Sequence, residues 1–515
     1  MQRRLGALSL AVPGLFAVVV AAAGSEAAIQ QPPVEAIPIF ANAVTIPIAA
    51  RVHGTRFFQT DTRIYNPTLD PKEFDLYYVG SLQTGSTATK TTRIVPPGQV
   101  LALDDFVQSE FGQSNSLGQL TILADDTNFL ANSHTYSQGS GGTFGFAAPG
   151  FKNSSALILG SGTATANGLA KTPTMHTNVG FTETGGFPVT LKIDVRDSNG
   201  ILIATTSRQT EPYTTSVITD ILLDRGIPSQ TNFRTDFTVV PNRDGRPNGR
   251  ALPFATTVDK VTGDSVFHAP LMPPTTTDDT IIAAASHVVG LNGNFFQTTL
   301  NVTNLGTTTA GFTISLLPLV LPPDFDSSKP TTLTYFVLPG QTLELLDVLS
   351  TAFDLDAPVA AGLRIHPLSA AGARLAVSSR TLIAQSGGTS GFSIDGVLAG
   401  TALTMGNTVT AIGLDHTAAV SGTRINFGLT EVAGADVFVE VTAVDGNTGS
   451  PLATKTYFVP ASTSLQANAE DLLGTGVAAS NFYLQFTIVS GDGHVVAYAG
   501  GVDNASGDVN YVLAQ

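Results

Sequence analysis

The stretch Phe57-Phe58-Gln59-Thr60 returns later in the chain as Phe295-Phe296-Gln297-Thr298. Alternate side chains of a β-strand point to the same face of its sheet. One face is therefore shared by Phe58, Thr60, Thr62 and Ile64 in the first copy and by Phe296, Thr298, Leu300 and Val302 in the second. This repetition predicts a leading strand that packs this face into a core. Replacing Phe58 by alanine is then expected to cost about 3–5 kcal/mol, as for a buried aromatic residue.

Other short motifs recur at nearly the same offset, which lies between 238 residues (57 to 295) and 248 residues (178 to 426). Loops change length easily, so this small drift indicates a duplicated unit. The recurring motifs are the Pro-Gly turns Val95–Gly98 and Leu338–Gly340, the glycine hairpins Gly141–Thr143 and Gly387–Thr389, the strand ends Asn178–Glu183 and Asn426–Glu431, the Asp-Gly-type hairpins Asp197–Gly200 and Asp445–Asn447, and the closing hairpins Val258–Asp264 and Val502–Asp508.

Short alternating runs of Thr, Val, Ile, Phe and Tyr, separated by turn residues, predict an all-β chain. The size of each segment and its strand spacing favour four tandem immunoglobulin-like β-sandwich modules, arranged as a duplicated two-module unit. The expected boundaries are a signal peptide at 1–28, a Pro-rich leader at 29–43, sandwiches at 44–150 and 154–273, a linker at 274–279, and sandwiches at 280–398 and 401–515.

These motifs together resemble the tandem β-sandwich repeats of secreted bacterial proteins whose function is uncharacterised. The resemblance spans about Val44 to Gln515 and depends on turn and core residues. It implies an immunoglobulin-like fold and export from the cell. It carries no catalytic residue to this chain.

The composition limits the partners. The net charge is −15 and only 13% of the residues are charged. Nucleic-acid binding depends on clustered Lys and Arg, so a nucleic-acid partner is not expected. The absence of cysteine from the 515 residues excludes disulfides, thiolate metal sites and a cysteine nucleophile.

The first 28 residues have the pattern of a secretory signal peptide. Arg3 and Arg4 precede an apolar stretch from Leu5 to Ala23, and small residues follow it. An uncleaved membrane anchor is the alternative, but Pro13 and Gly14 interrupt the apolar run. We therefore expect a secreted, extracellular, periplasmic or cell-surface protein with no transmembrane helix after signal removal.

Four aspartates of the closing hairpins could supply oxygen ligands to calcium: Asp259, Asp264, Asp503 and Asp508. Calcium needs six to eight oxygens, and two carboxylates per loop are few. Tight turns also select aspartate beside glycine, so turn formation is the competing interpretation. Apart from calcium at these positions, the sequence predicts no cofactor.

No arrangement for catalysis stands out. Ser133 and His134 are neighbours on a predicted strand and point to opposite faces, so His134 is interpreted as a strand-surface residue. The paired acids Asp104-Asp105 and Glu470-Asp471 are interpreted as helix caps rather than a glycosidase pair, and an Asp347 cap is expected likewise. A row of aromatic residues could stack on sugars but is interpreted as core: Tyr65, Tyr77, Tyr78, Phe144 and Phe146. Glu183 and Glu431 are interpreted as strand-end or turn residues.

These observations predict a non-catalytic, exported repeat protein with a cell-surface structural or adhesive role, its modules forming a rod or pairs. The alternative is a carbohydrate- or matrix-binding protein that uses loops at module ends, with a glycan or a surface protein as partner. A secreted hydrolase is the third hypothesis. It would require a cleft that assembles acids, or a Ser-His-acid set, from different modules.

Overall fold

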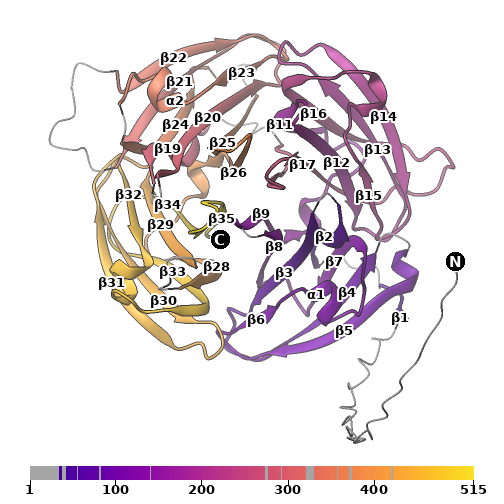
Figure 1. The fold of residues 1–515 in the computed structure, drawn as a ribbon, viewed down its shortest axis with the longest axis horizontal. Helices are drawn as coiled ribbons and strands as arrows, with labels where there is room; N and C mark the ends of the chain where they lie inside the picture. The colour runs from indigo at the N-terminus through magenta and orange to yellow at the C-terminus, as the bar shows by residue number, and fades with distance from the viewer. Residues whose placement is uncertain are drawn as a thin grey trace, which may run out of the picture. The chain divides into compact units, whose positions relative to one another are not determined.

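The chain folds into antiparallel β-sheets, with 61% of residues in strands and 6% in helices in the computed structural model (Figure 1). The predicted all-β class is confirmed. The structure describes residues 34–37, 42–54, 56–80, 83–139, 141–272, 277–290, 293–319, 330–356, 358–369, 374–417, 419 and 422–515. The predicted signal peptide lies outside these residues, as do most of the predicted leader and positions 274–276 of the predicted linker.

The strands of the first half fall into two groups, preceded by β1 (Val34–Glu35). The first group is β2 (Ala43–His53), β3 (Phe57–Tyr65), β4 (Lys72–Gly80), β5 (Ala88–Val95), β6 (Val100–Leu103), β7 (Ser116–Leu123), β8 (Leu130–Gly139) and β9 (Gly142–Pro149), with helix α1 (Phe106–Ser109). After β10 (Phe151–Lys152), the second group is β11 (Thr163–Lys171), β12 (Met175–Glu183), β13 (Val189–Arg196), β14 (Leu202–Thr210), β15 (Thr215–Ile218), β16 (Gln230–Val240), β17 (Ala251–Asp259) and β18 (Ser265–His268).

The second half repeats this series of strands from β2 to β18 and adds one helix. Its first group is β19 (Thr280–Val289), β20 (Phe295–Asn304), β21 (Ala310–Pro318), β22 (Thr332–Val337), β23 (Thr342–Leu345), β24 (Val359–Pro367), β25 (Leu375–Gln385) and β26 (Gly388–Asp395), with helix α2 (Val348–Thr351). After β27 (Val397–Leu398), the second group is β28 (Thr408–His416), β29 (Thr423–Glu431), β30 (Val437–Asp445), β31 (Pro451–Val459), β32 (Ser464–Asn468), β33 (Ala479–Gly491), β34 (Val495–Asp503) and β35 (Val509–Leu513), with helix α3 (Ala469–Leu473).

One strand order occurs four times. In the second group it is β11-β16-β13-β14 in one sheet and β15-β12-β17-β18 in the other, and the fourth group repeats it as β28-β33-β30-β31 and β32-β29-β34-β35. The first and third groups have the same order, but β2 and β19 pair with the next strand and join the two sheets. We call the groups repeats 1 to 4, a name that refers to strand order alone. The module boundaries inferred from the sequence stay predictions.

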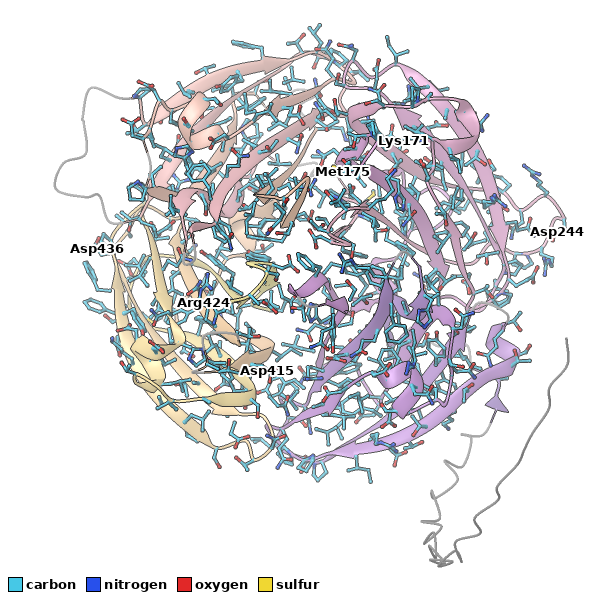
Figure 2. The ribbon with its side chains drawn as sticks, in the orientation of Figure 1. Lys171, Met175, Asp244, Asp415, Arg424 and Asp436 are labelled. Carbon is cyan, nitrogen blue, oxygen red and sulfur yellow. The ribbon has the colours of Figure 1, made fainter. Side chains whose placement is uncertain are left out.

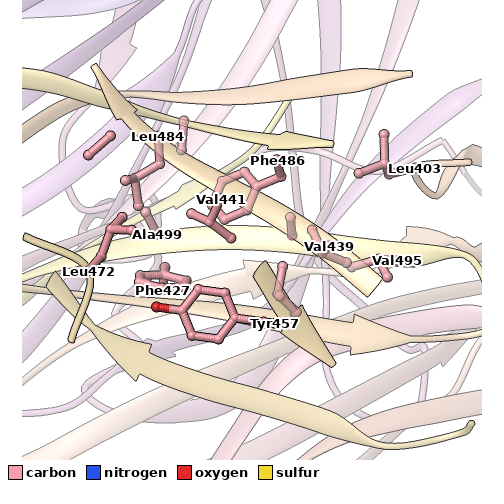
Figure 3. Packing of buried hydrophobic residues seen from close by; sticks show 14 of the residues in the cluster. Leu403, Phe427, Val439, Val441, Tyr457, Leu472, Leu484, Phe486, Val495 and Ala499 are labelled. Carbon is pink, nitrogen blue, oxygen red and sulfur yellow. The ribbon is translucent and has the colours of Figure 1, made fainter. Parts of the chain in front are cut away.

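Each repeat contains its own cluster of buried apolar side chains between its two sheets. In repeat 4, Phe427 of β29 and Phe486 of β33 face each other from the two sheets, with Tyr457 beside them (Figure 3). Burying a side chain of this size contributes about 1.5–3 kcal/mol. These clusters account for the sandwich-like character of the sheets.

Strand β3 follows the predicted alternation only in part. Thr60, Thr62 and Ile64 are fully buried, whereas Phe58 is half-buried and belongs to no core cluster. Phe58 lies at the start of the strand, where it pairs with Val52 and Ser137 beyond the apolar centre of the sandwich. The expected cost of 3–5 kcal/mol for Phe58→Ala is therefore too large.

The residues Pro32–Gln515 form one compact unit in which every repeat contacts two others. Thr182 of repeat 2 donates to the carbonyl oxygen of Pro47 in repeat 1 (2.7 Å), and Thr430 of repeat 4 donates to that of Ala283 in repeat 3 (2.9 Å). Repeat 2 contacts repeat 3, where the Asn167 side chain donates to the carbonyl oxygen of Ala376 at 3.2 Å.

The circuit is completed between repeats 4 and 1, where the hydroxyl of Tyr483 donates to the carbonyl oxygen of Gly98 (2.8 Å). The Tyr65 and Tyr483 rings also contact each other across this interface, with centroids 4.7 Å apart. A rod would leave the first and last repeats apart. The rod arrangement is therefore wrong for this unit.

No helix among the described residues combines the length and the apolar character needed to cross a membrane.

Candidate functional site

The closing hairpins of the four repeats meet at one place, which we call the junction. Strand β9 contacts β18 and β35, and β26 contacts the same two strands, so the last strands of all four repeats surround a common centre. Figure 1 shows β9, β26 and β35 close together at this point. The aspartates predicted as calcium ligands all belong to these hairpins.

Asp503 and Asp508 hold the closing hairpin of repeat 4 to that of repeat 1. Asp503 Oδ2 accepts hydrogen bonds from the backbone amide (3.0 Å) and hydroxyl (2.7 Å) of Thr143, and Asp508 Oδ2 accepts one from the Gly145 amide (2.9 Å). In return, Ser506 donates its hydroxyl proton to the carbonyl oxygen of Thr143 (2.8 Å). We call this set of contacts the 4–1 latch.

The other half of the chain contains an equivalent set, the 2–3 latch. Asp259 Oδ2 accepts from the amide (2.8 Å) and hydroxyl (3.2 Å) of Thr389, and Asp264 Oδ2 accepts from the Gly391 amide (2.9 Å). Thr262 donates to the carbonyl oxygen of Thr389, as Ser506 does for Thr143. The Gly-Gly-Thr hairpins and the Asp-rich hairpins noted in the sequence are thus partners of each other.

The calcium interpretation of these four aspartates stays a prediction, and the structure supplies another use for their oxygens. The second oxygen of Asp259 accepts from the amides of Val261 and Thr262, and that of Asp503 from Ala505 and Ser506. Within the described ranges, no group of three or more His, Cys, Asp or Glu residues has the geometry of a metal site.

The two remaining oxygens, Oδ1 of Asp264 and Oδ1 of Asp508, are buried without a hydrogen-bond partner among the described residues. Burial raises the pKa of Asp264 to about 8, and burial also raises the pKa of Asp508, which the neighbouring Asp264 raises further. Arg380 opposes the shift at Asp264 but does not cancel it. The junction therefore holds two carboxyl groups whose pKa values are both raised by burial.

A polar cavity of about 110 Å³ lies between repeats 1 and 4 beside the 4–1 latch. Its wall includes Asp61, Arg63, His134, Asp415 and Asp508, and Figure 2 labels Asp415. Burial lowers the pKa of His134 to about 4, with a further contribution from Arg63, so this imidazole is neutral at pH 7. His134 is half-buried, because β28 of repeat 4 lies against β8.

The second face of β3 makes its polar contacts within repeat 1. Asp61 accepts a hydrogen bond from the Asp105 amide (2.8 Å), and Arg63 forms an ion pair with Asp104 (2.8 Å). Burial raises the pKa of Asp61. No sequence pattern marked these residues, because polar alternation on a strand normally indicates a solvent-exposed face.

The expected helix caps differ from those in the structure. Asp105 and Asp347 precede α1 and α2 with left-handed backbone (φ of 43° and 46°), and neither side chain caps its helix. Asp105 instead pairs with Arg51 and Asp347 with His287. Helix α3 is capped by Asn468, which accepts from the Asp471 amide (2.9 Å), while the Asp471 carboxylate binds Lys455 and Tyr457. Asp105, Asp347 and Asp471 therefore make no side-chain N-cap, but Glu470 and Asp471 lie in the first turn of α3, where acids complement the helix dipole as expected.

The residue at the end of the second strand of each repeat is polar and buried, and its side chain forms hydrogen bonds with the backbone of the adjacent loops. Glu183 accepts hydrogen bonds from the amides of Gly185, Gly186, Tyr213 and Arg250, at 2.5–3.0 Å. Glu431 accepts from those of Ala433, Gly434, Ser462 and His494. Asn66 and Asn304 take the corresponding places in repeats 1 and 3 and donate to loop carbonyl groups. The strand-end interpretation is confirmed, and the burial shows why these positions are polar.

The aromatic row predicted to be core is buried: Tyr65, Tyr77, Tyr78, Phe144 and Phe146 are all at most 8% exposed. Phe146 takes part in an aromatic cluster at the junction, to which each closing strand contributes one ring. Phe146 stacks on Phe267 (centroids 5.6 Å apart), and Phe392 stacks on Tyr511 (5.9 Å).

An apolar-lined cavity at the junction measures about 380 Å³ and is lined by residues of all four repeats. Its wall includes Ala148, Phe267, Val397, Ile412, Tyr511 and Leu513. We call it the apolar cavity. Volumes of about 300–1,000 Å³ are typical of small-molecule sites, so this cavity is the part of the junction with room for a ligand.

Comparison with known proteins gives no family. No family model matches the chain, and no curated protein matches it. Among solved structures, a glycoside hydrolase of family 32 from Bifidobacterium adolescentis aligns with 8% identity over 88% of this chain and 99% of that chain, with a TM-score of 0.13. A TM-score this low carries no argument about fold or activity.

Proposed function

We propose that this chain is a non-catalytic, exported protein with a structural or adhesive role, in which the circuit of repeats forms a rigid scaffold. The observation that carries this proposal is that the motifs that recur in the two halves form contacts between repeats. The Gly-Gly-Thr and Asp-rich hairpins form the two latches. The Pro-Gly turns contact a neighbouring repeat of the circuit, as in the hydrogen bond from the Val100 amide of repeat 1 to the Gly446 carbonyl group of repeat 4 (2.7 Å).

The matching turn of the other half also forms a hydrogen bond to a neighbouring repeat. The Thr342 amide, just after the turn Leu338–Gly340, donates to the carbonyl oxygen of Ser198 at 2.8 Å. Gly200 lies against Gly340 so closely that a Cβ atom there would overlap the Gly340 carbonyl group. Motifs kept in both halves thus serve assembly of the scaffold, which supports a role other than catalysis.

An adhesive role is supported by exposed apolar side chains on the fourth main strand of every repeat. These strands are β5, β14, β22 and β31, and their exposed residues include Ile94 (65% exposed), Leu202 (46%), Phe336 (69%) and Phe458 (44%). Strands β14, β22 and β31 each end their sheet, and only the two-residue β1 lies outside β5. Strands at sheet edges with exposed apolar residues are ready contact surfaces for another chain.

Recognition of carbohydrate or matrix is the second candidate, and one exposed aromatic pair favours it. Phe438 of β30 and Phe458 of β31 lie with ring centroids 4.9 Å apart and remain more than 40% exposed. Exposed rings of this kind can stack against a sugar or pack on a protein partner. The partner under either candidate is a glycan or protein of a surface.

A binding screen of the chain from Ala28 to Gln515 tests both candidates. The chain is applied to glycans and extracellular-matrix proteins, with calcium present or chelated. Saturable binding to a protein that is lost in Phe336→Ser/Phe458→Ser, with an unchanged melting temperature, supports adhesion. Saturable glycan binding that is lost in Phe438→Ser supports the second candidate. Absence of saturable binding to every surface contradicts both.

A further inference from the structure

The apolar cavity contains one acidic side chain that the fold does not use. Asp395, the last residue of β26, lies in the cavity wall, and no hydrogen bond or ion pair to its carboxylate occurs among the described residues. Burial raises the pKa of Asp395 to about 7, and no nearby cation offsets this effect. Asp395 is half-buried, and an unpaired carboxylate in the wall of a cavity is a common feature of functional sites.

The surroundings of Asp395 favour a positively charged ligand over a negatively charged one. None of the residues lining the apolar cavity is Lys, Arg or His, so nothing there favours an anion. Tyr511 also lies in the wall, and its buried hydroxyl has no hydrogen-bond partner in the described part of the chain. Asp395 and Tyr511 are close enough for the carboxylate to raise the pKa of the phenol.

Aromatic rings add a second attraction for a cation. Phe267 and Tyr511 line the cavity, and each stacks on the ring of a neighbouring closing strand, Phe146 and Phe392 respectively. The face of an aromatic ring attracts ammonium groups, and the attraction grows when the site excludes water. The remaining wall is aliphatic, including Ile412, Val397 and Leu513, and suits an apolar body.

We propose that the apolar cavity is a binding site for an organic ammonium ion, whose charged group meets Asp395 and the Tyr511 ring while its hydrocarbon part fills the aliphatic side. This site goes beyond the scaffold role, because neither latch nor any contact between repeats requires Asp395. It would give the junction a ligand whose binding stabilises all four repeats together, since each contributes to the wall.

Matched probes test the proposal: 4-phenylbutylammonium, 4-phenylbutan-1-ol and 4-phenylbutanoate, which differ in the terminal group. Their affinities for the full chain are measured by calorimetry at about pH 8, where more of Asp395 is ionised. A charge-assisted contact should make the ammonium ion bind at least about tenfold more tightly than the alcohol. The carboxylate should bind more weakly than the alcohol.

Two cavity variants and one control complete the experiment. Asp395→Asn keeps the side-chain shape and should remove the preference for the ammonium ion while changing alcohol binding less than about threefold. Val397→Phe should weaken both probes by filling the cavity. Asp492→Asn, at an exposed position, should change nothing.

The proposal is overturned if the alcohol binds as tightly as the ammonium ion, if Asp395→Asn leaves the preference intact, or if no probe binds. Melting temperatures show whether each variant is folded. Asp395→Asn removes an unpaired charge from the cavity wall and is not expected to lower the melting temperature.

Discussion

Glu183 and Glu431 are fully buried carboxylates that survive in the interior because each is surrounded by amide donors. Burial raises the pKa of Glu183, and the four amide hydrogen bonds oppose that rise. The carboxylate joins segments far apart in the chain, since the amides of Gly185, Tyr213 and Arg250 all point at it. A single side chain thereby fixes three loops at one end of repeat 2.

Replacing Glu183 by glutamine is expected to destabilise the chain by about 2–4 kcal/mol, because an amide group would present N–H donors to N–H donors. Chemical denaturation followed by circular dichroism measures the loss. Glu73→Gln, on the exposed face of β4, is the matched control and should change the free energy of unfolding by less than about 0.5 kcal/mol. Equal effects of the two variants would contradict the organising role.

Individual residues were predictable where their partners are local. Alternation placed Thr60, Thr62 and Ile64 in the core correctly, because this pattern depends only on strand geometry. It did not show that Asp61, Arg63 and His134 line a cavity shared with repeat 4. This cavity brings together residues more than 300 positions apart, such as His134 and Asp508, and no local pattern contains that information.

At the scale of elements, the two latches explain why the closing hairpins are so similar in the two halves. A glycine hairpin exposes its amides, and an aspartate on the partner hairpin accepts from them, as Asp503 does from Thr143. The carboxylate accepts several bonds at once and is strengthened by its charge. Sequence reasoning found both hairpin types, but it assigned them separately because nothing in the chain indicates which hairpin meets which.

Asp503→Ala is expected to open the 4–1 latch and leave the 2–3 latch intact. The loss should be about 2–4 kcal/mol, since the Thr143 amide and hydroxyl would remain without an acceptor. Hydrogen exchange should accelerate in the segment around Thr143 and not in that around Thr389. Asp259→Ala should give the reverse pattern, which makes each variant the control of the other. Acceleration in both segments with either variant would contradict two separate latches.

At the scale of the whole molecule, the junction links stability to pH. The pKa of Asp264 is raised from an ordinary value of 3.8 to about 8, and that of Asp508 is raised too, so the folded chain binds protons that the unfolded chain releases. This stabilisation is complete below the unfolded pKa and is lost as pH rises through the folded pKa. Four histidines have lowered pKa values, and they act in the opposite sense up to about pH 7.5, where the unfolded imidazoles still bind protons: His134, His176, His268 and His416.

The melting temperature should therefore fall as pH rises from about 7.5 to about 8.5, where the carboxyl groups contribute most of the change. Each proton released on unfolding contributes at most about 1.4 kcal/mol per pH unit. Asp508→Asn removes one of the two neighbouring acids and should flatten the dependence, whereas Asp492→Asn should leave it unchanged. A melting temperature that rises across this window would show that both carboxyl groups are ionised in the folded chain.

The circuit of contacts makes a prediction that an open arrangement of repeats does not share. Phe427 is fully buried in the core of repeat 4, so Phe427→Ala should destabilise this repeat by about 3–5 kcal/mol. Repeat 4 contacts repeat 3, where the Gly362 amide donates to Ser464, and also repeat 1, where the Val100 amide donates to Gly446. Weakening repeat 4 should therefore loosen both neighbours.

Hydrogen exchange distinguishes the two arrangements through these amides. In a closed circuit, exchange in Phe427→Ala accelerates around Gly362 and around Val100 to a similar degree, while the core strands of repeat 2 keep their protection. An open arrangement predicts acceleration around Gly362 alone, because repeat 4 would have one neighbour. Phe458→Ala, on the exposed face of the same repeat, should leave both segments unchanged. The Val100 segment is the decisive reporter, since its bond to Gly446 joins residues that are distant in sequence and meet only if the circuit closes.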